Sequence, residues 1–208
     1  MTAPGPLDTL VLDLGNVLVP WDPRRAFDGL VEPAEVDRFL ADVDFPELNR
    51  TLDAGRDWAD ARRELAAMGP WYARMLDLYL AHFPRTLTGE VPGMADLVSE
   101  LHGLGVRLLG LTNWSAATFH HAVPAAPAVG LLEDVVVSGR EGVGKPDRRI
   151  FELVVERFGL VVERTLFVDD SPANVRAARA VGLPAVVFTD AGALRADLRA
   201  RGVPVAAA

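Results

Sequence analysis

Five short apolar runs recur along the chain, at residues 10–12, 106–111, 135–137, 166–168 and 185–188. Their hydrophobicity is continuous rather than alternating, which is typical of strands buried on both faces of a parallel sheet. Helical segments separate several runs: one starts at Pro146 and ends before Gly159, and another starts near Pro172 and ends at Gly182. This alternation predicts an α/β fold, a three-layer Rossmann-like core built on a doubly wound parallel sheet.

The alternation of strands and helices stops between Trp21 and about Thr88. In this stretch the apolar positions recur at helical spacing, with start signals at Pro23 and Pro33 and a stop signal at Gly69, and no run has the pattern of a strand. A helix near residues 92–102 then leads back into the strand pattern. We therefore predict an all-helical cap inserted after the first strand, with bounds of 20–88 for the cap and 1–19 and 89–208 for the core.

Composition narrows the classes of function. With 208 residues, half of them apolar, the chain can bury one substantial core. It has 21 Lys and Arg residues against 29 Asp and Glu residues, a net charge of −8, and no visible basic patch, so we expect neither nucleic acid nor an anionic membrane as a partner. Residues 1–7 lack a basic segment before an apolar stretch, and no apolar run approaches the roughly 20 residues of a membrane span. The absence of cysteine excludes disulfides, thiol nucleophiles and thiolate metal sites, and it suits a cytoplasmic location.

Chemically active side chains follow the predicted strands. Ligands of open parallel sheets bind beyond the carboxyl ends of the strands, so these positions are the first candidates for a site. The first strand ends at Asp13, the second leads to Thr112 and Asn113, the third leads to Lys145, and the fourth ends at the pair Asp169-Asp170. The predicted fold brings all of these residues to one edge of the sheet.

With these motifs the sequence resembles the haloacid dehalogenase-like superfamily. Four motifs occur in the family's order: Asp13-Leu14-Gly15-Asn16-Val17, Leu111-Thr112-Asn113, Gly144-Lys145-Pro146 and Phe167-Val168-Asp169-Asp170-Ser171. The first motif is similar to that of a subgroup that includes a sugar-1-phosphate phosphatase. The resemblance implies a Mg²⁺-dependent hydrolase that acts on a small phosphate monoester through an aspartyl-phosphate intermediate.

The resemblance also implies roles for the residues of these motifs. Asp13 would be the nucleophile, as carboxylates are in covalent catalysis of this kind. Mg²⁺ would be bound by Asp13, the backbone carbonyl of Gly15 and Asp170, with Asp169 as an outer or alternative ligand, and oxygen ligands suit this ion. Thr112 would donate its hydroxyl to the phosphate.

A carboxylate that attacks a phosphate dianion needs positive charge nearby. At 4 Å and an effective dielectric of 20, each pair of like charges repels by about 4 kcal/mol. Lys145 and the metal would offset this repulsion, and backbone N–H groups around Asn16 and Asn113 would complete the phosphate cradle. Trp114, which follows a strand end directly, and Arg50, in the predicted cap, are further candidates for substrate binding.

One departure from the family concerns proton transfer. Typical phosphatases of the superfamily carry a second aspartate two residues after the nucleophile, which protonates the leaving oxygen, whereas this chain has Gly15 there. Loss of a general acid commonly costs on the order of 100-fold to 10,000-fold in rate. A sugar 1-phosphate would relax the need for an acid because its hemiacetal oxygen is a better leaving group than an ordinary alcohol; another residue or water is the other source of the proton.

The sequence is also compatible with two other functions. A metal-independent 2-haloacid dehalogenase would use Asp13 to attack carbon, but it has no need of the carboxylates Asp169 and Asp170. A catalytically weak binding protein that keeps the fold would explain Gly15, but not the retention of the other motif residues.

Several residues of the predicted cap have two interpretations. The aromatic side chains between Trp58 and Tyr79 recur at helical spacing, which favours the core of a helical unit over a binding stripe. The polar stretch from Asn49 to Arg56, which includes Asp53, is either a loop that enters the site or a solvated turn. Trp21 and Trp114 are candidates for the wall of a substrate pocket.

Overall fold

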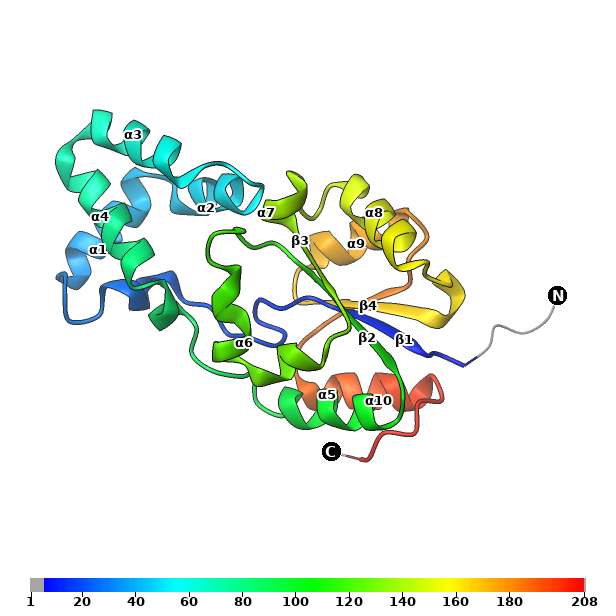
Figure 1. Ribbon diagram of the computed structural model, residues 1–208. Coiled ribbons are helices and arrows are strands. Elements are labelled where there is room, and N and C mark those ends of the chain that lie inside the picture. The colour runs from blue at the N-terminus through cyan, green and yellow to red at the C-terminus, as the bar shows by residue number, and fades with distance from the viewer. Residues whose placement is uncertain (1–5, 208) are drawn as a thin grey trace.

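The computed structural model describes residues 6–207, and the outermost residues assigned to the core, 1–5 and 208, lie outside this range. Its centre is a parallel sheet in the order β3-β2-β1-β4-β5. Figure 1 labels strands β1 to β4 of this sheet. The strands are β1 (Thr9–Leu12), β2 (Arg107–Thr112), β3 (Val135–Val137), β4 (Thr165–Asp169) and β5 (Ala185–Val187). The predicted α/β class and all five predicted strands are confirmed, with boundaries that differ by one residue at most.

Successive residues of the strands face opposite sides of the sheet, and each side packs on its own helices. On one side Leu10 and Leu166 belong to a core that includes residues of α5 (Met94–Gly103) and α10 (Ala191–Ala200). On the other side Val11 and Phe167 pack in a core with α8 (Arg148–Phe158) and α9 (Pro172–Ala180). In Figure 1 these two pairs of helices lie on opposite faces of the sheet. The predicted three-layer arrangement is therefore confirmed.

Short helices complete the core. They are α6 (Ala122–Ala125) and α7 (Ser138–Glu141), with 3-10 turns at Phe119–His121, Pro127–Leu131 and Val162–Arg164. The predicted start of α8 at Pro146 is wrong by two residues. The side chain of Asp147 accepts a hydrogen bond from the backbone N–H of Arg149, so Asp147 is the N-cap and the helix begins after it.

The stretch between β1 and α5 contains four α-helices and no strand among its residues, all of which the structure describes. The helices are α1 (Pro33–Asp42), α2 (Phe45–Asp53), α3 (Trp58–Met68) and α4 (Pro70–Ala81), with 3-10 turns at Pro23–Phe27 and Phe83–Thr86. In Figure 1 they lie together beyond the carboxyl end of β1. The predicted helix start near Pro23 is a 3-10 turn, whereas the start at Pro33 and the stop at Gly69 agree with α1 and α3.

An aromatic cluster holds these helices together. Tyr79 is fully buried and packs edge-on against Phe45 and Phe83, with ring centroids 5.1 and 5.8 Å away. The ring of Trp58 stacks on that of Tyr79, with centroids 6.1 Å apart. The core interpretation is thus right for Tyr79, but Trp58 is only half-buried and also borders a pocket, described below.

Among residues 6–207, no helix combines the length and apolarity needed to cross a bilayer.

Candidate active site

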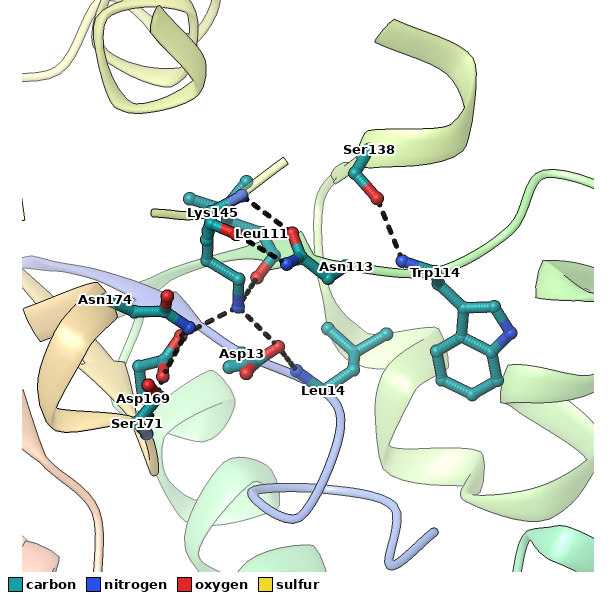
Figure 2. Close-up of polar contacts among 10 residues, drawn as sticks. All are labelled: Asp13, Leu14, Leu111, Asn113, Trp114, Ser138, Lys145, Asp169, Ser171 and Asn174. Carbon is teal, nitrogen blue, oxygen red and sulfur yellow. Dashed lines mark hydrogen bonds and ion pairs between the residues drawn. The ribbon is translucent and has the colours of Figure 1, made fainter. Parts of the chain in front are cut away.

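The Asp13 carboxylate lies just past the end of β1, where the sheet fixes its backbone. Its N–H donates to the carbonyl of Val168 in β4, at 2.8 Å. Its Oδ1 accepts hydrogen bonds from the backbone N–H of Leu14, at 2.7 Å, and from Nζ of Lys145, at 2.8 Å. In Figure 2 both contacts end on the same oxygen. These contacts fix the rotation of a carboxylate that is 7% exposed.

The Lys145 ammonium is buried among three acceptors. Besides Oδ1 of Asp13, its Nζ contacts Oδ2 of Asp169 at 2.7 Å and the backbone carbonyl of Leu111 at 3.0 Å (Figure 2). A lysine ammonium has three N–H donors, so each has one acceptor here. The loop that carries Lys145 is tied to the end of β2 by Asn113, whose side chain donates to the carbonyl of Lys145 and accepts from its N–H, both at 2.8 Å.

The two adjacent aspartates after β4 differ in their surroundings. Both oxygens of Asp169, which is fully buried, have donors: Ser171 N–H and Asn174 Nδ2 reach Oδ1 at 2.8 and 3.0 Å, and Lys145 reaches Oδ2 (Figure 2). Asp169 therefore holds Lys145 in place. Asp170 is only half-buried, which leaves it more accessible to a ligand.

Burial and charge set the protonation of this group. Burial raises the pKa of Asp13 to about 7, against the opposing attraction of Lys145. Burial also raises the pKa of Asp170, and the neighbouring Asp169 adds to this shift. Burial disfavours the charged form of Lys145, but Asp13 and Asp169 outweigh it, and the pKa of Lys145 is raised. Lys145 therefore stays cationic, while Asp13 gains negative charge only near neutral pH.

The carboxylates of Asp13, Asp169 and Asp170 form a group that fits a hard cation. Ligand oxygens of the three lie within 4.8 Å of one another. Because the oxygens of Asp169 already have donors, Asp13 and Asp170 are the better placed for direct coordination. An all-oxygen donor set of this kind suits Mg²⁺.

The structure places the other predicted residues around this centre. Thr112 is the buried last residue of β2, and Trp114 is buried nearby, with its N–H donating to the hydroxyl of Ser138 at 3.0 Å. Asn16 adopts a left-handed backbone conformation (φ 55°), and its N–H donates to the carbonyl of Val19 at 2.8 Å. Arg50 is largely exposed and forms an ion pair with Glu47.

A pocket of about 120 Å³ lies between the strand ends and the inserted helices. The strand-end side includes Gly15, Asn16 and Asn113. Much of the remaining wall is aromatic and comes from four side chains: Trp21, Trp58, Phe83 and Trp114. Trp21 and Trp114 therefore border the pocket as the sequence suggested. Across it, Trp58 Nε1 donates to the hydroxyl of Ser115 at 2.8 Å, which ties α3 to the loop after β2.

Sequence reasoning missed one residue of this centre, Asn174, and one that supports the neighbouring pocket, Ser138. Asn174 contacts both oxygens of Asp169, at 3.0 and 3.1 Å, and Ser138 donates to the backbone carbonyl of Asp53. The Asn174 contact is local, five residues along the chain in the first turn of α9, and it is absent from the four sequence motifs. The Ser138 contact joins residues 85 positions apart, so it depends on tertiary placement.

Comparison with known proteins places this geometry in a family. The model for haloacid dehalogenase-like hydrolases matches residues 7–182. A sesquiterpene phosphatase, astK of Aspergillus oryzae, is 36% identical over 51% of this chain and 54% of its own length. Phosphoglycolate phosphatase of Rhodospirillum rubrum is 32% identical over 53% of this chain and 47% of its own length. The match thus spans about half the length of both phosphatases, whereas CbbY of Rhodobacter capsulatus, 27% identical, is matched over 92% of this chain and 88% of its own.

Solved structures share the fold. An enzyme of the same family from Bacteroides thetaiotaomicron, solved with magnesium and inorganic phosphate, superposes with a TM-score of 0.68 at 19% identity, over 88% of this chain and 95% of its own. L-2-haloacid dehalogenase of Xanthobacter autotrophicus superposes with a TM-score of 0.62 at 17% identity, over 92% and 82%. With the family model matched over most of the chain, the protein belongs to the haloacid dehalogenase-like hydrolases.

Proposed function

We propose that the protein is a phosphatase that hydrolyses a small phosphate monoester, with Asp13 as the nucleophile. The observation that carries this proposal is the buried centre in which one ammonium, Lys145, contacts two carboxylates beside a third, Asp170. Three carboxylates and one ammonium give a net negative charge, so the centre needs a further cation before it can accept a phosphate dianion. A haloacid dehalogenase has no such need, and the phosphatases among the relatives agree with the choice.

The proposed residues divide the reaction between them. Asp13 attacks phosphorus and forms an aspartyl-phosphate, which water then cleaves. Lys145 keeps Asp13 oriented and offsets the charge of the phosphoryl group, with Asp169 and Asn113 as positioning residues for Lys145. Thr112 and the backbone around Asn16 and Asn113 line the phosphate end of the site.

Mg²⁺ is the proposed cofactor. Asp13, Asp170 and the backbone carbonyl of Gly15 would hold it, with Asp169 behind them. When bound, it supplies positive charge that neutralises the phosphoryl oxygens and favours the ionised form of Asp13.

The inserted helices are the proposed cap, residues 20–88, on a catalytic core of 1–19 and 89–208. They contribute Trp21, Trp58 and Phe83 to the pocket wall and so exclude water from the leaving group. Arg50 borders a smaller cavity with Asn113 and Lys145, and from there it is proposed to contact the substrate. An aromatic wall suits the flat face of a sugar ring or an apolar group. A sugar 1-phosphate is therefore one candidate, and a prenyl phosphate is another.

Phosphate release from a panel of compounds tests the proposal. The panel contains glucose 1-phosphate, a farnesyl phosphate, phosphoglycolate, phosphoserine and 4-nitrophenyl phosphate, each with Mg²⁺ and with a chelator. We expect release that requires Mg²⁺ and that Asp13→Asn abolishes. Halide release from 2-chloropropionate that survives the chelator would instead identify a dehalogenase, and phosphate release by Asp13→Asn would remove the assigned nucleophile.

A further inference from the structure

A single acidic side chain faces the aromatic pocket. Among the residues that line it, only Asp53, the last residue of α2, has an ionisable side chain. Asp53 also borders the adjacent cavity of about 30 Å³, together with Asn113 and Lys145. Asp53 therefore borders both the aromatic pocket and a small cavity lined by Lys145, the residue that contacts the Asp13 carboxylate.

There is open space around position 15, where typical phosphatases of the superfamily have the second aspartate. Gly15 lines the same pocket as Asp53, and a Cβ built at Gly15 meets no atom within 4 Å. The space beside Gly15 is therefore free of side chains. Among the side chains that line the pocket, the carboxyl group of Asp53 is the acid that could give a proton to a leaving group held there.

The surroundings of Asp53 favour its protonated form and hold it in place. Burial raises the pKa of Asp53 to about 7, although hydrogen bonds from the backbone of Ser115 and from Asn49 oppose the shift. The Asn49 Nδ2 donates to Oδ2 of Asp53 at 2.7 Å, which fixes the carboxyl. Its position at the end of α2 acts in the same direction as burial, because the carboxyl end of a helix disfavours an anion.

Other titratable groups face Asp53 from the elements around it. Tyr79 of α4 lies close enough that the Asp53 charge adds to the effect of burial, which raises the pKa of Tyr79. Arg50 of α2 and Lys145 border the shared small cavity and would favour the ionised form. A carboxyl group in this balance exchanges its proton near neutral pH, as a general acid must.

Building on the proposed phosphatase activity, we infer that Asp53 is the general acid that takes the place of the aspartate absent at Gly15. As Asp13 bonds to phosphorus, the bond from phosphorus to the leaving oxygen breaks and its electron pair goes to that oxygen. Asp53 gives this oxygen its proton, and the product leaves as an alcohol. Water then attacks phosphorus and gives a proton to the Asp53 carboxylate, while the bond from phosphorus to Asp13 breaks. Phosphate is released, and both carboxyl groups return to their first state.

Two substrates of similar shape separate proton donation from other roles. Benzyl phosphate releases an alkoxide that needs a proton, whereas 4-nitrophenyl phosphate releases a stable phenolate; both carry a ring that suits the aromatic wall. With Mg²⁺ present, Asp53→Asn should lower kcat for benzyl phosphate by about 100-fold or more and kcat for 4-nitrophenyl phosphate by less than about tenfold. Asp53→Glu, which keeps a carboxyl group, should retain more activity on benzyl phosphate than Asp53→Asn. Asp37→Asn, which removes an exposed carboxylate of α1, should leave both rates unchanged.

The pH profile provides an independent readout. For the wild-type enzyme, kcat on benzyl phosphate should fall above about pH 7 as Asp53 loses its proton, and this alkaline limb should be absent in Asp53→Asn. Equal losses on both substrates, or an alkaline limb that persists in the variant, would overturn the assignment of Asp53 and leave the phosphatase activity standing. Wild-type turnover of 4-nitrophenyl phosphate without turnover of benzyl phosphate would also overturn it. A wild-type enzyme that cleaves neither these compounds nor any phosphate ester of the panel above would refute the proposed function itself.

Discussion

Replacement of Asp13 by asparagine should abolish turnover and stabilise the fold. The pKa of Asp13 rises from its usual 3.8 to about 7, mainly because the carboxylate is buried. At 1.36 kcal/mol per pH unit, keeping this group ionised above pH 7 costs the folded state about 4 kcal/mol. Asparagine has nearly the same shape, its amide oxygen can still accept from Leu14 N–H and Lys145, and Lys145 keeps Asp169 as a counter-ion. Because a buried amide has a desolvation cost of its own, we expect a gain of about 2 to 4 kcal/mol.

The sign of the pH dependence makes this prediction specific. The pKa of Asp13 is raised in the folded protein. Below about pH 4 this carboxyl group is protonated in both the folded and the unfolded protein, so its burial does not lower the free energy of unfolding there. The wild-type protein loses stability relative to Asp13→Asn as pH rises from about 4 to about 7, and the difference is complete above about pH 7. Urea unfolding in the presence of a chelator, at pH 5 and pH 8, measures this difference. With a slope of about 2 kcal/mol per molar urea, the gain at pH 8 moves the midpoint by roughly 1 to 2 M.

A matched control and a clear contrary result complete the test. Asp37→Asn removes an exposed carboxylate and should change stability by less than about 0.5 kcal/mol at either pH. If Asp13→Asn were destabilised equally at pH 5 and pH 8, the ion pair with Lys145 would be a net stabilising contact, and the argument from burial would be refuted.

Other changes at the centre have equally defined outcomes. Lys145→Met leaves Asp13 and Asp169 buried without their cation, so it should cost about 3 to 5 kcal/mol of unfolding free energy in urea titrations at pH 8, and a protein as stable as wild type would contradict this role. Asn113→Ala removes two hydrogen bonds to the Lys145 backbone and should cost about 2 kcal/mol in the same assay; a loss of kcat without loss of stability would instead indicate direct substrate contact. Asp170→Asn should raise the Mg²⁺ concentration for half-maximal phosphate release at least about tenfold, and an unchanged magnesium titration would remove Asp170 as a ligand. Gly15→Asp should fold normally, since its Cβ meets open space, and should raise kcat on benzyl phosphate; a loss of both stability and activity would show that the pocket cannot accept a side chain there.

Much of the fold follows from local patterns in the sequence. Buried parallel strands are continuous apolar runs, so residues 135–137 could be identified without any knowledge of their neighbours. Helix boundaries are harder to predict where two start signals are adjacent, as with the proline Pro146 and the capping side chain of Asp147. The side chain of Asp147 caps the first turn, so α8 starts at Arg148, and Pro146 lies two residues before this start.

The centre itself was only partly predictable. The position of Asp13, Lys145 and Asp170 follows from the rule that ligands bind at the carboxyl ends of parallel strands. That rule does not distinguish Asp169 from Asp170, because the two differ in the donors that reach them. Lys145, 24 residues earlier in the chain, and Asn174, in the first turn of α9, both donate to Asp169. The dual interpretation of the stretch around Asp53 had the same cause, since only tertiary placement shows whether a polar helix end faces solvent or a pocket.

The three contacts of the Lys145 ammonium also affect how the protein is made. They join the end of β1, the end of β2 and the end of β4, and Asp13 is synthesised long before Asp169. A growing chain on the ribosome therefore carries the proposed nucleophile, Asp13, for most of its synthesis without Lys145 and Asp169. Contacts between segments far apart in the chain can form only when both segments are present, so we expect activity to appear only after β4 has docked beside β1. Incomplete chains released before that point would lack the proposed phosphatase activity.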